Sequence, residues 1–416
     1  MATFVETLKN NPIFQLSLSS KELFHSNFLA WLAEDDNTRC VFNKVMQTWL
    51  DDKNWEYKPN EMEVKREYNH FDFCVCDKLT IDGNDVTGSV QVVLENKFKS
   101  IAYKAQLVDY KDRTKTLNEE GYKNKYKTEE ANKGKILPRG WRDEVKHPNT
   151  KYILLTLADN FLDKDEIQSL GWKIVTYAEY AKLLRTVVGE LKDDEIKGNK
   201  AFYVELIAQY CDFIEKFSEH INECLDNVKE NNYWDILKND DFTAVRCNDI
   251  WQKVVMHKYA QELFKLTQEK FPNTKIVFDD KDSWNEESDR PLMIRVAYFR
   301  NEALVELKYL LNNGVVFCVQ QQGDNGLSIG MVVKEEETIK KAVRKQDKGK
   351  WNASIKKLVA QKKLDEIITG DTFNSFQSEG SCGYYYIHHS EKLNIKKTLE
   401  KMVKLMEDAI NDSKQE

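Results

Sequence analysis

The 416-residue sequence is poor in proline and glycine, and it has no long apolar run and no C-x-x-C pair. With 6 Pro and 16 Gly, long flexible linkers and collagen-like or low-complexity segments are excluded. No stretch approaches the roughly 18 apolar residues of a membrane span, and the first residues lack the basic and apolar segments of a signal peptide. The 8 scattered cysteines argue against zinc and iron–sulfur sites and favour reduced thiols in a cytoplasm.

Positive charge is also in short supply, because 69 Asp and Glu residues outnumber 62 Lys and Arg residues and leave a net charge of −7. A surface that is basic all over, as in proteins that coat nucleic acid, is therefore excluded, whereas a local basic surface is not. Apolar residues make up 41% and charged residues 31%, which is typical of a globular protein with about two to three domains.

Hydrophobic periodicity predicts an α/β domain over residues 1–230 and an α+β domain over residues 231–416. In the first domain the predicted helices cover 19–32, 41–50, 102–113, 178–188 and 202–228, and the strands cover 71–75, 90–97, 152–157 and 172–177. In the second domain helices cover 249–271, much of 334–368 and 395–411, and strands cover 292–299, 303–310, 314–320, 327–333 and 383–388. Successive strands without intervening helices favour an antiparallel sheet there.

Two acids on neighbouring predicted strands are the strongest chemical signal. A turn centred between Gly83 and Asn84 would place Asp72 and Glu95 nearly opposite each other in a hairpin. Opposed side chains in an antiparallel pair lie about 4.5–5.5 Å apart, so two carboxylates there repel unless a cation lies between them. Mg²⁺ or Mn²⁺ supplies that charge and prefers oxygen ligands.

Lys97 completes this group, because two residues along a strand share one face and Lys97 follows Glu95 by two. Two acids, a lysine and a divalent metal can hydrolyse a phosphodiester, since the metal activates a water and the lysine orients it or offsets charge on phosphorus. The alternative is that Asp72 and Glu95 face solvent and Lys97 is their surface ion-pair partner. The apolar residues around Glu95 disfavour that alternative.

Asp72 together with Glu95-Asn96-Lys97 resembles the D…(D/E)-x-K core of the PD-(D/E)XK nucleases. Further elements are similar to one branch of that superfamily, and the resemblance spans about residues 10–220. These elements are the helix over 22–32, the Gln106-x-x-x-Tyr110 helix and the strands over 152–157 and 172–177. Phe71 stands where the superfamily usually has a proline.

The resemblance implies a restriction-endonuclease-like α/β/α core that cleaves phosphodiester bonds, above all in DNA, with a role in prokaryotic defence or restriction. It implies a metal held by Glu22, Asp72 and Glu95, and a catalytic set of Asp72, Glu95, Lys97, Gln106 and Tyr110. Glu22 has the alternative role of completing a capping box begun by Ser19. Gln106 and Tyr110, four apart on one helix face, could instead be a surface residue and a packing residue.

His25, one turn after Glu22, could contact phosphate or be a buried structural histidine. The polar stretch over 114–150 carries nine basic and six acidic residues with interleaved Tyr122, Tyr126 and Trp141. Such a stretch can bind backbone phosphates and stack bases, or it can be a solvated loop. The candidates for nucleic-acid binding are Lys123, Lys125, Lys127, Arg139 and Arg142.

The second domain shows no catalytic motif and is predicted to recognise substrate or a protein partner. Its run of three tyrosines over 384–386, followed by His388-His389, could contact nucleic acid or form an ordinary strand edge. Two further functions stay open for the whole chain. One is a nucleic-acid-binding or regulatory subunit whose nuclease fold no longer cuts. The other is an interaction protein whose second domain gates the nuclease until a partner binds.

Overall fold

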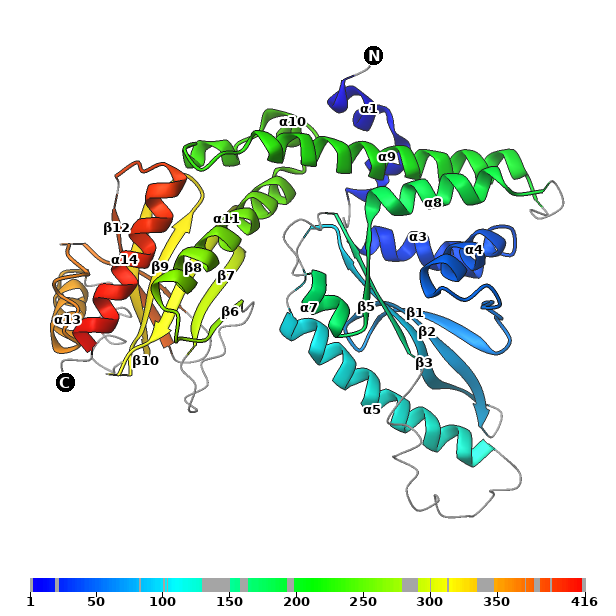
Figure 1. Cartoon of the computed structure of the whole chain (residues 1–416), viewed down its shortest axis with the longest axis horizontal. Coiled ribbons are helices and arrows are strands. Elements are labelled where there is room, and N and C mark those ends of the chain that lie inside the picture. Colours follow the sequence, from blue (N-terminus) through cyan, green and yellow to red (C-terminus); the bar gives the residue numbers. More distant parts are fainter. Residues whose placement is uncertain are drawn as a thin grey trace. The chain divides into compact units, whose positions relative to one another are not determined.

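The computed structural model describes residues 3–18, 22–81, 84–99, 102, 104–128, 150–157, 164–192, 198–278, 291–299, 301–312, 314–334, 348–370, 372–377, 382–389 and 391–413. The chain forms two compact units (Figure 1). The first consists of Met1–Cys224 and Ala244–Arg246, and the second of Leu225–Thr243 and Cys247–Glu416. None of the helices in the described ranges is long and apolar enough to cross a membrane.

The first unit is built on a mixed five-stranded sheet in the order β1-β2-β3-β4-β5. Its strands are β1 (Met62–Tyr68), β2 (Phe71–Ile81), β3 (Asn84–Lys97), β4 (Lys151–Thr156) and β5 (Trp172–Thr176). The first three strands pair antiparallel, and β3, β4 and β5 pair parallel. Parallel neighbours need crossover connections, and these contain α5 (Lys104–Thr128) and α7 (Lys164–Ser169).

Helices cover both faces of this sheet, which confirms the predicted α/β/α core (Figure 1). On one face α5 packs on β2 and β3, and α7 packs on β5. On the other face α3 packs on β1 and β2, while α4 packs on α3 and α8. The remaining bounds are α1 (Phe4–Asn10), α2 (Pro12–Ser17), α3 (Leu23–Glu34), α4 (Arg39–Leu50), α8 (Tyr177–Gly189) and α9 (Lys200–Asn227).

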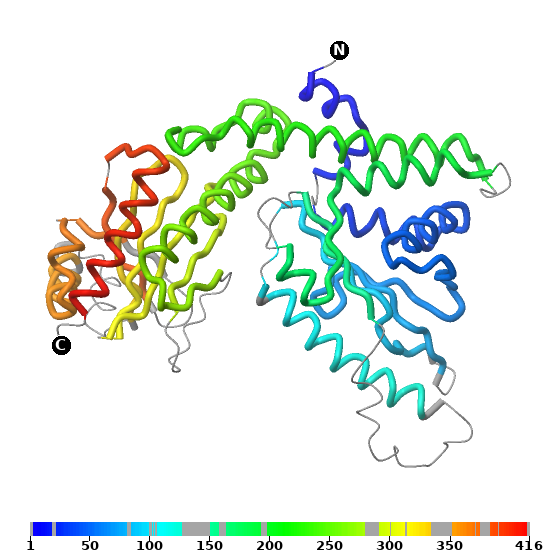
Figure 2. Tube along the Cα trace, in the orientation of Figure 1, coloured from blue at the N-terminus to red at the C-terminus, as the bar shows by residue number. Residues whose placement is uncertain are grey.

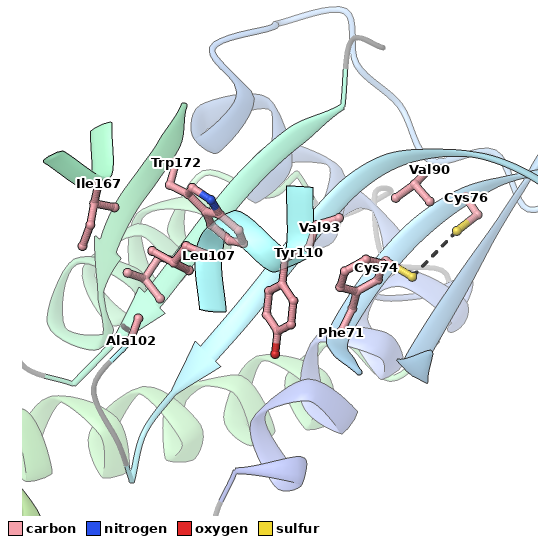
Figure 3. Close-up of a cluster of buried hydrophobic side chains, with 11 residues drawn as sticks. Phe71, Cys74, Cys76, Val90, Val93, Ala102, Leu107, Tyr110, Ile167 and Trp172 are labelled. Carbon is pink, nitrogen blue, oxygen red and sulfur yellow. Dashed lines mark hydrogen bonds between the residues drawn. The ribbon is translucent and has the colours of Figure 1, made fainter. Parts of the chain in front are cut away.

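The core between α5 and the sheet is apolar and joins residues far apart in sequence (Figure 3). The Tyr110 ring stands edge-on to Phe71, with ring centroids 5.4 Å apart, and its hydroxyl points out of the cluster (Figure 3). The cluster comprises Phe71, Cys74, Cys76, Val90, Val93, Ala102, Leu107, Tyr110, Leu154, Ile167 and Trp172. This core fixes the face of β3 on which the candidate site lies.

Helix α5 is much longer than the predicted helix over 102–113, and it takes in the start of the polar stretch over 114–150. Its buried stripe continues through Thr114, Asn118 and Gly121 at helical spacing. Asn118 accepts a hydrogen bond from the Val90 N–H at 2.7 Å and donates one to Thr150 Oγ1 at 3.0 Å. Periodicity of apolar residues misses this half of the helix because its packing face is polar. Strand β1 and helix α7 were not predicted either.

The second unit contains a seven-stranded sheet in the order β11-β12-β10-β9-β8-β7-β6. The strands are β6 (Ile276–Phe278), β7 (Leu292–Phe299), β8 (Glu302–Leu310), β9 (Val316–Gln322), β10 (Leu327–Lys334), β11 (Asn374–Gln377) and β12 (Cys382–His389). All neighbours pair antiparallel except β6 and β7. The α+β class predicted for this part is therefore confirmed.

Two helices pack on one face of this second sheet (Figure 2). Helix α11 (Asn248–Lys270) packs on β7 and β8, and α14 (Ile395–Ser413) packs on β8, β9 and α11. The other helical elements are η2 (Trp234–Leu237), α10 (Asp240–Ala244) and α13 (Lys348–Gln361). Strand β12 lies between β10 and β11, so the tyrosine run is not at a sheet edge.

Candidate active site

The β2–β3 hairpin brings the two predicted acids together. Phe73 pairs with Leu94, and the N–H of Asn96 donates a hydrogen bond to Asp72 Oδ2 at 2.7 Å. Asp72 and Glu95 are the next residues along each strand, so the register sets them against each other. The hairpin therefore places Asp72 and Glu95 opposite each other, as the sequence predicted.

The predicted position of the turn is wrong, and two β-bulges make up the difference. Ile81 pairs with Asn84, whereas a turn centred between Gly83 and Asn84 would pair Ile81 with Val86. Between the Ile81–Asn84 pair and the Phe73–Leu94 pair, β2 spans eight residues and β3 spans ten. The register shifts lie at Val75/Cys76 and Cys76/Lys78, and each adds one residue to β3. Together the two bulges shift the register of β3 by two residues. Side chains alternate between the two faces of a strand, so an even shift leaves Glu95 on the same face of the sheet and places it opposite Asp72.

One oxygen of the Glu95 carboxylate receives three donors. Lys97 Nζ lies 2.7 Å from Glu95 Oε1, Gln106 Nε2 donates to it at 3.1 Å, and the Tyr110 hydroxyl donates at 3.2 Å. Gln106 also donates to the Tyr110 oxygen at 2.9 Å. The other oxygen, Oε2, is buried and has no hydrogen-bond partner among the residues described. Only 1% of Glu95 is exposed, so water cannot readily replace the missing donor.

Asp72 is the most perturbed acid of the site. Burial raises its pKa to about 8, and the nearby carboxylates of Glu95 and Glu22 add to the effect against the opposing pull of Lys97. Burial likewise raises the pKa of Glu95, although Lys97 and Tyr110 counteract part of the rise. Both shifts are what two carboxyl groups in a poorly hydrated site show when a single lysine compensates them only in part.

Lys97 keeps its charge in this setting. Burial disfavours its ammonium group, but the charges of Glu95, Asp72 and Glu22 outweigh burial and raise the pKa of Lys97 above its ordinary value. Its side chain is 12% exposed, so the ammonium can be reached from solvent. Lys97 can therefore donate hydrogen bonds and offset negative charge at neutral pH, but it cannot accept a proton there.

Glu22 stands at the entrance of α3 and does not cap the helix through its side chain. Its Oε1 accepts the Lys99 N–H at 3.0 Å, and its Oε2 lies 3.8 Å from Lys99 Nζ. Ser19, the other half of the predicted capping box, lies outside the described residues. Helix α3 begins at Leu23, so Glu22 is not at the third helical position that the predicted box requires.

Asn96 was missed as a supporting residue. Its side chain, 1% exposed in total, points to the face opposite Glu95 and Lys97, where its Nδ2 donates to the Glu22 carbonyl at 2.7 Å. The Tyr177 hydroxyl donates to its Oδ1. Asn96 thus ties β3 to the starts of α3 and α8, while its backbone holds Asp72. Strand alternation predicts that Asn96 lies on the face opposite Glu95 and Lys97, but nothing in the sequence identifies Glu22 and Tyr177 as its hydrogen-bond partners.

His25 is a structural residue. Its ring is fully buried among Phe98, Tyr177 and Phe213, and its Nδ1 lies 2.8 Å from the Tyr210 hydroxyl oxygen. Burial lowers the pKa of His25 to about 3, so the ring is neutral at physiological pH. A contact with substrate phosphate is incompatible with this position.

Three of the predicted basic residues lie far along α5 from the carboxylates. Lys123, Lys125 and Lys127 are in the last turns of this helix, about 25–32 Å along it from Gln106 at 1.5 Å per residue. Arg139 and Arg142 lie outside the described residues. Any nucleic acid that these lysines touch must therefore extend well beyond the scissile bond.

The donor set fits a divalent metal ion held by two carboxylates. Within the described part of the chain, no three His, Cys, Asp or Glu side chains form a group that could hold a metal. Glu22 is engaged with Lys99 and does not join Asp72 and Glu95 in such a group. Mg²⁺ commonly takes only one or two carboxylates and completes its shell with water and phosphate oxygens. The partnerless Oε2 of Glu95 and the carboxylate of Asp72, on the opposite strand, are ligands of that kind.

Comparison with known proteins agrees with this geometry. The sequence model of the PD-(D/E)XK nuclease superfamily matches residues 11–212, which make up most of the first unit. This match confirms the resemblance seen in the sequence over these residues, and the superfamily indicates a nuclease-type enzyme. No curated protein and no solved structure matches the chain significantly.

Proposed function

We propose that the first unit hydrolyses phosphodiester bonds in DNA with the help of Mg²⁺ or Mn²⁺. The observation that carries this proposal is the asymmetric Glu95 carboxylate. Lys97, Gln106 and Tyr110 saturate one oxygen, and the other is buried without a hydrogen-bond donor among the described residues. An unpaired buried acceptor costs about 1–3 kcal/mol, so a ligand that satisfies Oε2 would be favourable.

Asp72 and Glu95 would hold the ion. When bound, it lowers the pKa of a water ligand and stabilises negative charge on the phosphate. The three donors on Oε1 lock the Glu95 side chain, and Asn96 locks Asp72 through its backbone N–H. Such prior orientation removes the cost of organising the ligands during the reaction.

Lys97 would act on the reacting phosphate as a cation and hydrogen-bond donor. The neighbouring carboxylates raise the pKa of Lys97, which favours its charged form. A fixed ammonium in a poorly hydrated site stabilises charge that develops in the transition state. Gln106 and Tyr110 act as positioning residues, because both bind Glu95 and bind each other.

Cleavage of matched substrates tests this proposal. The full chain is incubated with duplex DNA, single-stranded DNA and RNA of one sequence, in EDTA and in Mg²⁺ or Mn²⁺. We expect metal-dependent cleavage of DNA, its loss in Asp72→Asn, and its retention in Asp85→Asn, a control acid that pairs with Lys78 near the hairpin end.

Other outcomes of the same assay are informative. Cleavage of RNA alone would refute DNA as the substrate. Tight binding of DNA without cleavage in either metal would favour the non-cutting regulatory subunit. Cleavage that persists in EDTA would refute the metal-dependent mechanism.

A further inference from the structure

A hollow in the second unit lies between the first turn of α14, the start of η2 and the turn that joins β9 to β10. Its volume is about 260 Å³. An engineered cavity of about 150 Å³ holds benzene, and sites for drug-sized ligands begin at about 300 Å³. The hollow therefore has room for one large side chain. It is lined by Tyr233, Trp234, Asp235, Gln321, Asp324, Gly326, Leu327, Glu391, Lys392, Leu393 and Thr398.

The walls of this hollow are fixed by the fold. Trp234 is 4% exposed, and its Nε1 donates a hydrogen bond to Thr398 Oγ1 at 2.9 Å, which joins η2 to α14. In the turn between β9 and β10, Gly326 has a φ of 55°, and a Cβ there would lie 2.1 Å from the His389 carbonyl oxygen. Glycine is therefore required at this position. A ligand would meet a preformed surface, which lowers the cost of binding.

One buried residue of the lining, Gln321, carries a hydrogen-bond acceptor that has no donor. Gln321 pairs with Leu327 across β9 and β10, so these two lining side chains share one face of the sheet. Only 1% of Gln321 is exposed. Its Nε2 donates to the Gly323 carbonyl at 3.0 Å, and its Oε1 accepts no hydrogen bond in the described part of the chain. A ligand with an N–H or O–H group that reaches Oε1 would therefore be favoured.

The charges around the hollow balance, so they favour neither a cation nor an anion. Two of its three acids are already paired with lysines. These ion pairs are Asp324 with Lys238 at 2.7 Å and Glu391 with Lys401 at 2.9 Å. The remaining charged residues of the lining, Asp235 and Lys392, have opposite signs. A neutral ligand therefore suits this hollow best.

The outer edge of the hollow has the composition of a protein interface. Tyr233 is 54% exposed beside the buried Trp234, and charged residues of both signs surround them. Tyrosine and tryptophan are enriched in protein interfaces, whose borders are polar. Residues that dominate binding at such interfaces fill pockets on the partner, and tryptophan is among the commonest of them. An indole ring is flat and neutral, and its N–H is a donor only, which matches a single free acceptor.

We propose that this hollow binds the side chain of a tryptophan from a protein partner, with the indole N–H donating to Gln321 Oε1. The ring would lie among Trp234, Leu327 and Leu393, with Tyr233 at its outer edge. The site belongs to the second unit and does not depend on the nuclease proposal. It would give a physical basis to the partner recognition that the sequence predicts for this part of the chain.

Saturation-transfer NMR on the full chain tests the proposal without a known partner. The probes are N-acetyltryptophanamide and its 1-methylindole derivative, which lacks the N–H donor. We expect the first probe to bind, and the methylated probe to bind about three- to tenfold more weakly, as for loss of one hydrogen bond. In Gln321→Met, which keeps the length of the side chain and removes the acceptor, the two probes should bind equally. Absence of binding by N-acetyltryptophanamide would refute the proposal, and so would an unchanged preference in Gln321→Met.

Tyr233→Ala is a second variant that keeps the proposal testable if Gln321→Met does not fold. The Tyr233 side chain is exposed, so its removal leaves the buried walls in place. We expect N-acetyltryptophanamide to bind several-fold more weakly to this variant. Phe202→Ala is the matched control, because Phe202 is an aromatic residue that is 56% exposed in the first unit. Equal affinity of the two variants would refute the assignment of the site.

Selection from a random peptide library on the full chain tests whether the ring comes from a protein. We expect tryptophan in the selected peptides, affinity at least about tenfold above that of free indole, and weaker binding to Tyr233→Ala. Indole that binds as tightly as the best peptide would mean a site for a small molecule and would refute the protein partner. Selected peptides that lack tryptophan, or that bind Tyr233→Ala as well as the wild-type chain, would also refute it.

Discussion

The molecule contains two buried glutamate–lysine pairs with the same spacing, and their surroundings give them different chemistry. Glu95 and Lys97 lie 2.7 Å apart on β3, and Glu306 and Lys308 lie 2.6 Å apart on β8. In both cases one residue separates the pair on a strand. Across the first pair stands an acid, Asp72, whereas across the second stands Arg295.

This difference decides how far the charge of each glutamate is compensated. The first site has two carboxylates for one lysine, and the pKa of Asp72 rises to about 8 because burial and the second acid disfavour its charge. A cation bound near the two carboxylates would offset their repulsion. In the second pair, the Glu306 carboxylate lies 2.6 Å from Lys308 Nζ and 3.8 Å from Arg295 Nη1, so cations already compensate its charge. The residue on the neighbouring strand, rather than the E-x-K spacing, therefore decides whether the glutamate meets a second acid or a second cation.

The largest expected effect is on cleavage by the first pair. Glu95→Gln and Lys97→Met should each lower the cleavage rate about 100-fold or more, because both groups act on the transition state. DNA binding should change much less. Single-turnover rates and filter binding measure the two effects, with Glu262→Gln and Lys265→Met as a matched exposed glutamate–lysine pair. Near wild-type cleavage by both site variants would refute the assignment of the active site.

The two pairs should also differ in their response to metal. Mg²⁺ at about 100 times its dissociation constant should stabilise the wild-type chain by about 2.7 kcal/mol. Glu95→Gln should lose most of this gain, whereas Glu306→Gln should retain it, because Glu306 already faces two cations. Thermal unfolding in EDTA and in Mg²⁺ gives both values. Equal loss in the two variants would contradict the contrast between the sites.

A smaller effect concerns the pH dependence of stability without metal. The pKa of Asp72 is about 8 in the folded protein and about 3.9 in an unfolded chain, so only the folded state holds this proton between about pH 4 and pH 8. Its contribution to stability is therefore fully present below about pH 4 and is lost as the pH rises to about 8. Asp72→Asn removes this loss.

The variant should consequently be more stable than wild type at pH 8 in EDTA, by at least about 1 kcal/mol, since one pKa unit corresponds to about 1.4 kcal/mol. The difference should shrink towards pH 4. Comparing the two proteins cancels the contribution of buried His25, whose pKa is lowered to about 3 by burial. A constant difference across this pH range would mean that Asp72 is not perturbed.

The smallest effect concerns the far end of α5, where binding and chemistry should separate. Replacing Lys123, Lys125 and Lys127 by Ala should weaken DNA binding and reduce the log–log salt slope by about 0.7–0.9 per lost phosphate contact. The rate at saturating substrate should change little, because these residues lie about 25–32 Å along the helix from Gln106. An unchanged slope in a salt titration would show that these three lysines have no role in binding.

Much of the first site could be predicted from local rules. Strand alternation places Glu95 and Lys97 on one face, and helical spacing places Gln106 and Tyr110 on another single face. Both predictions hold in the structure, where the four side chains meet at one oxygen. The hairpin signal also paired Asp72 with Glu95. The second unit was less informative, because its E-x-K pair lay in a run of strands without a motif to single it out.

The sequence by itself determined the faces on which side chains lie, because alternation and helical spacing depend only on local backbone geometry. Tertiary structure decided what each face meets. Two bulges in β3 shift the register so that Glu95 lies opposite Asp72. Asn96 accepts a hydrogen bond from Tyr177, which is 81 residues away in sequence. Strand order alone puts Arg295 beside Glu306. These are long-range pairings, and their energies depend on the whole packed sheet rather than on any short stretch of chain.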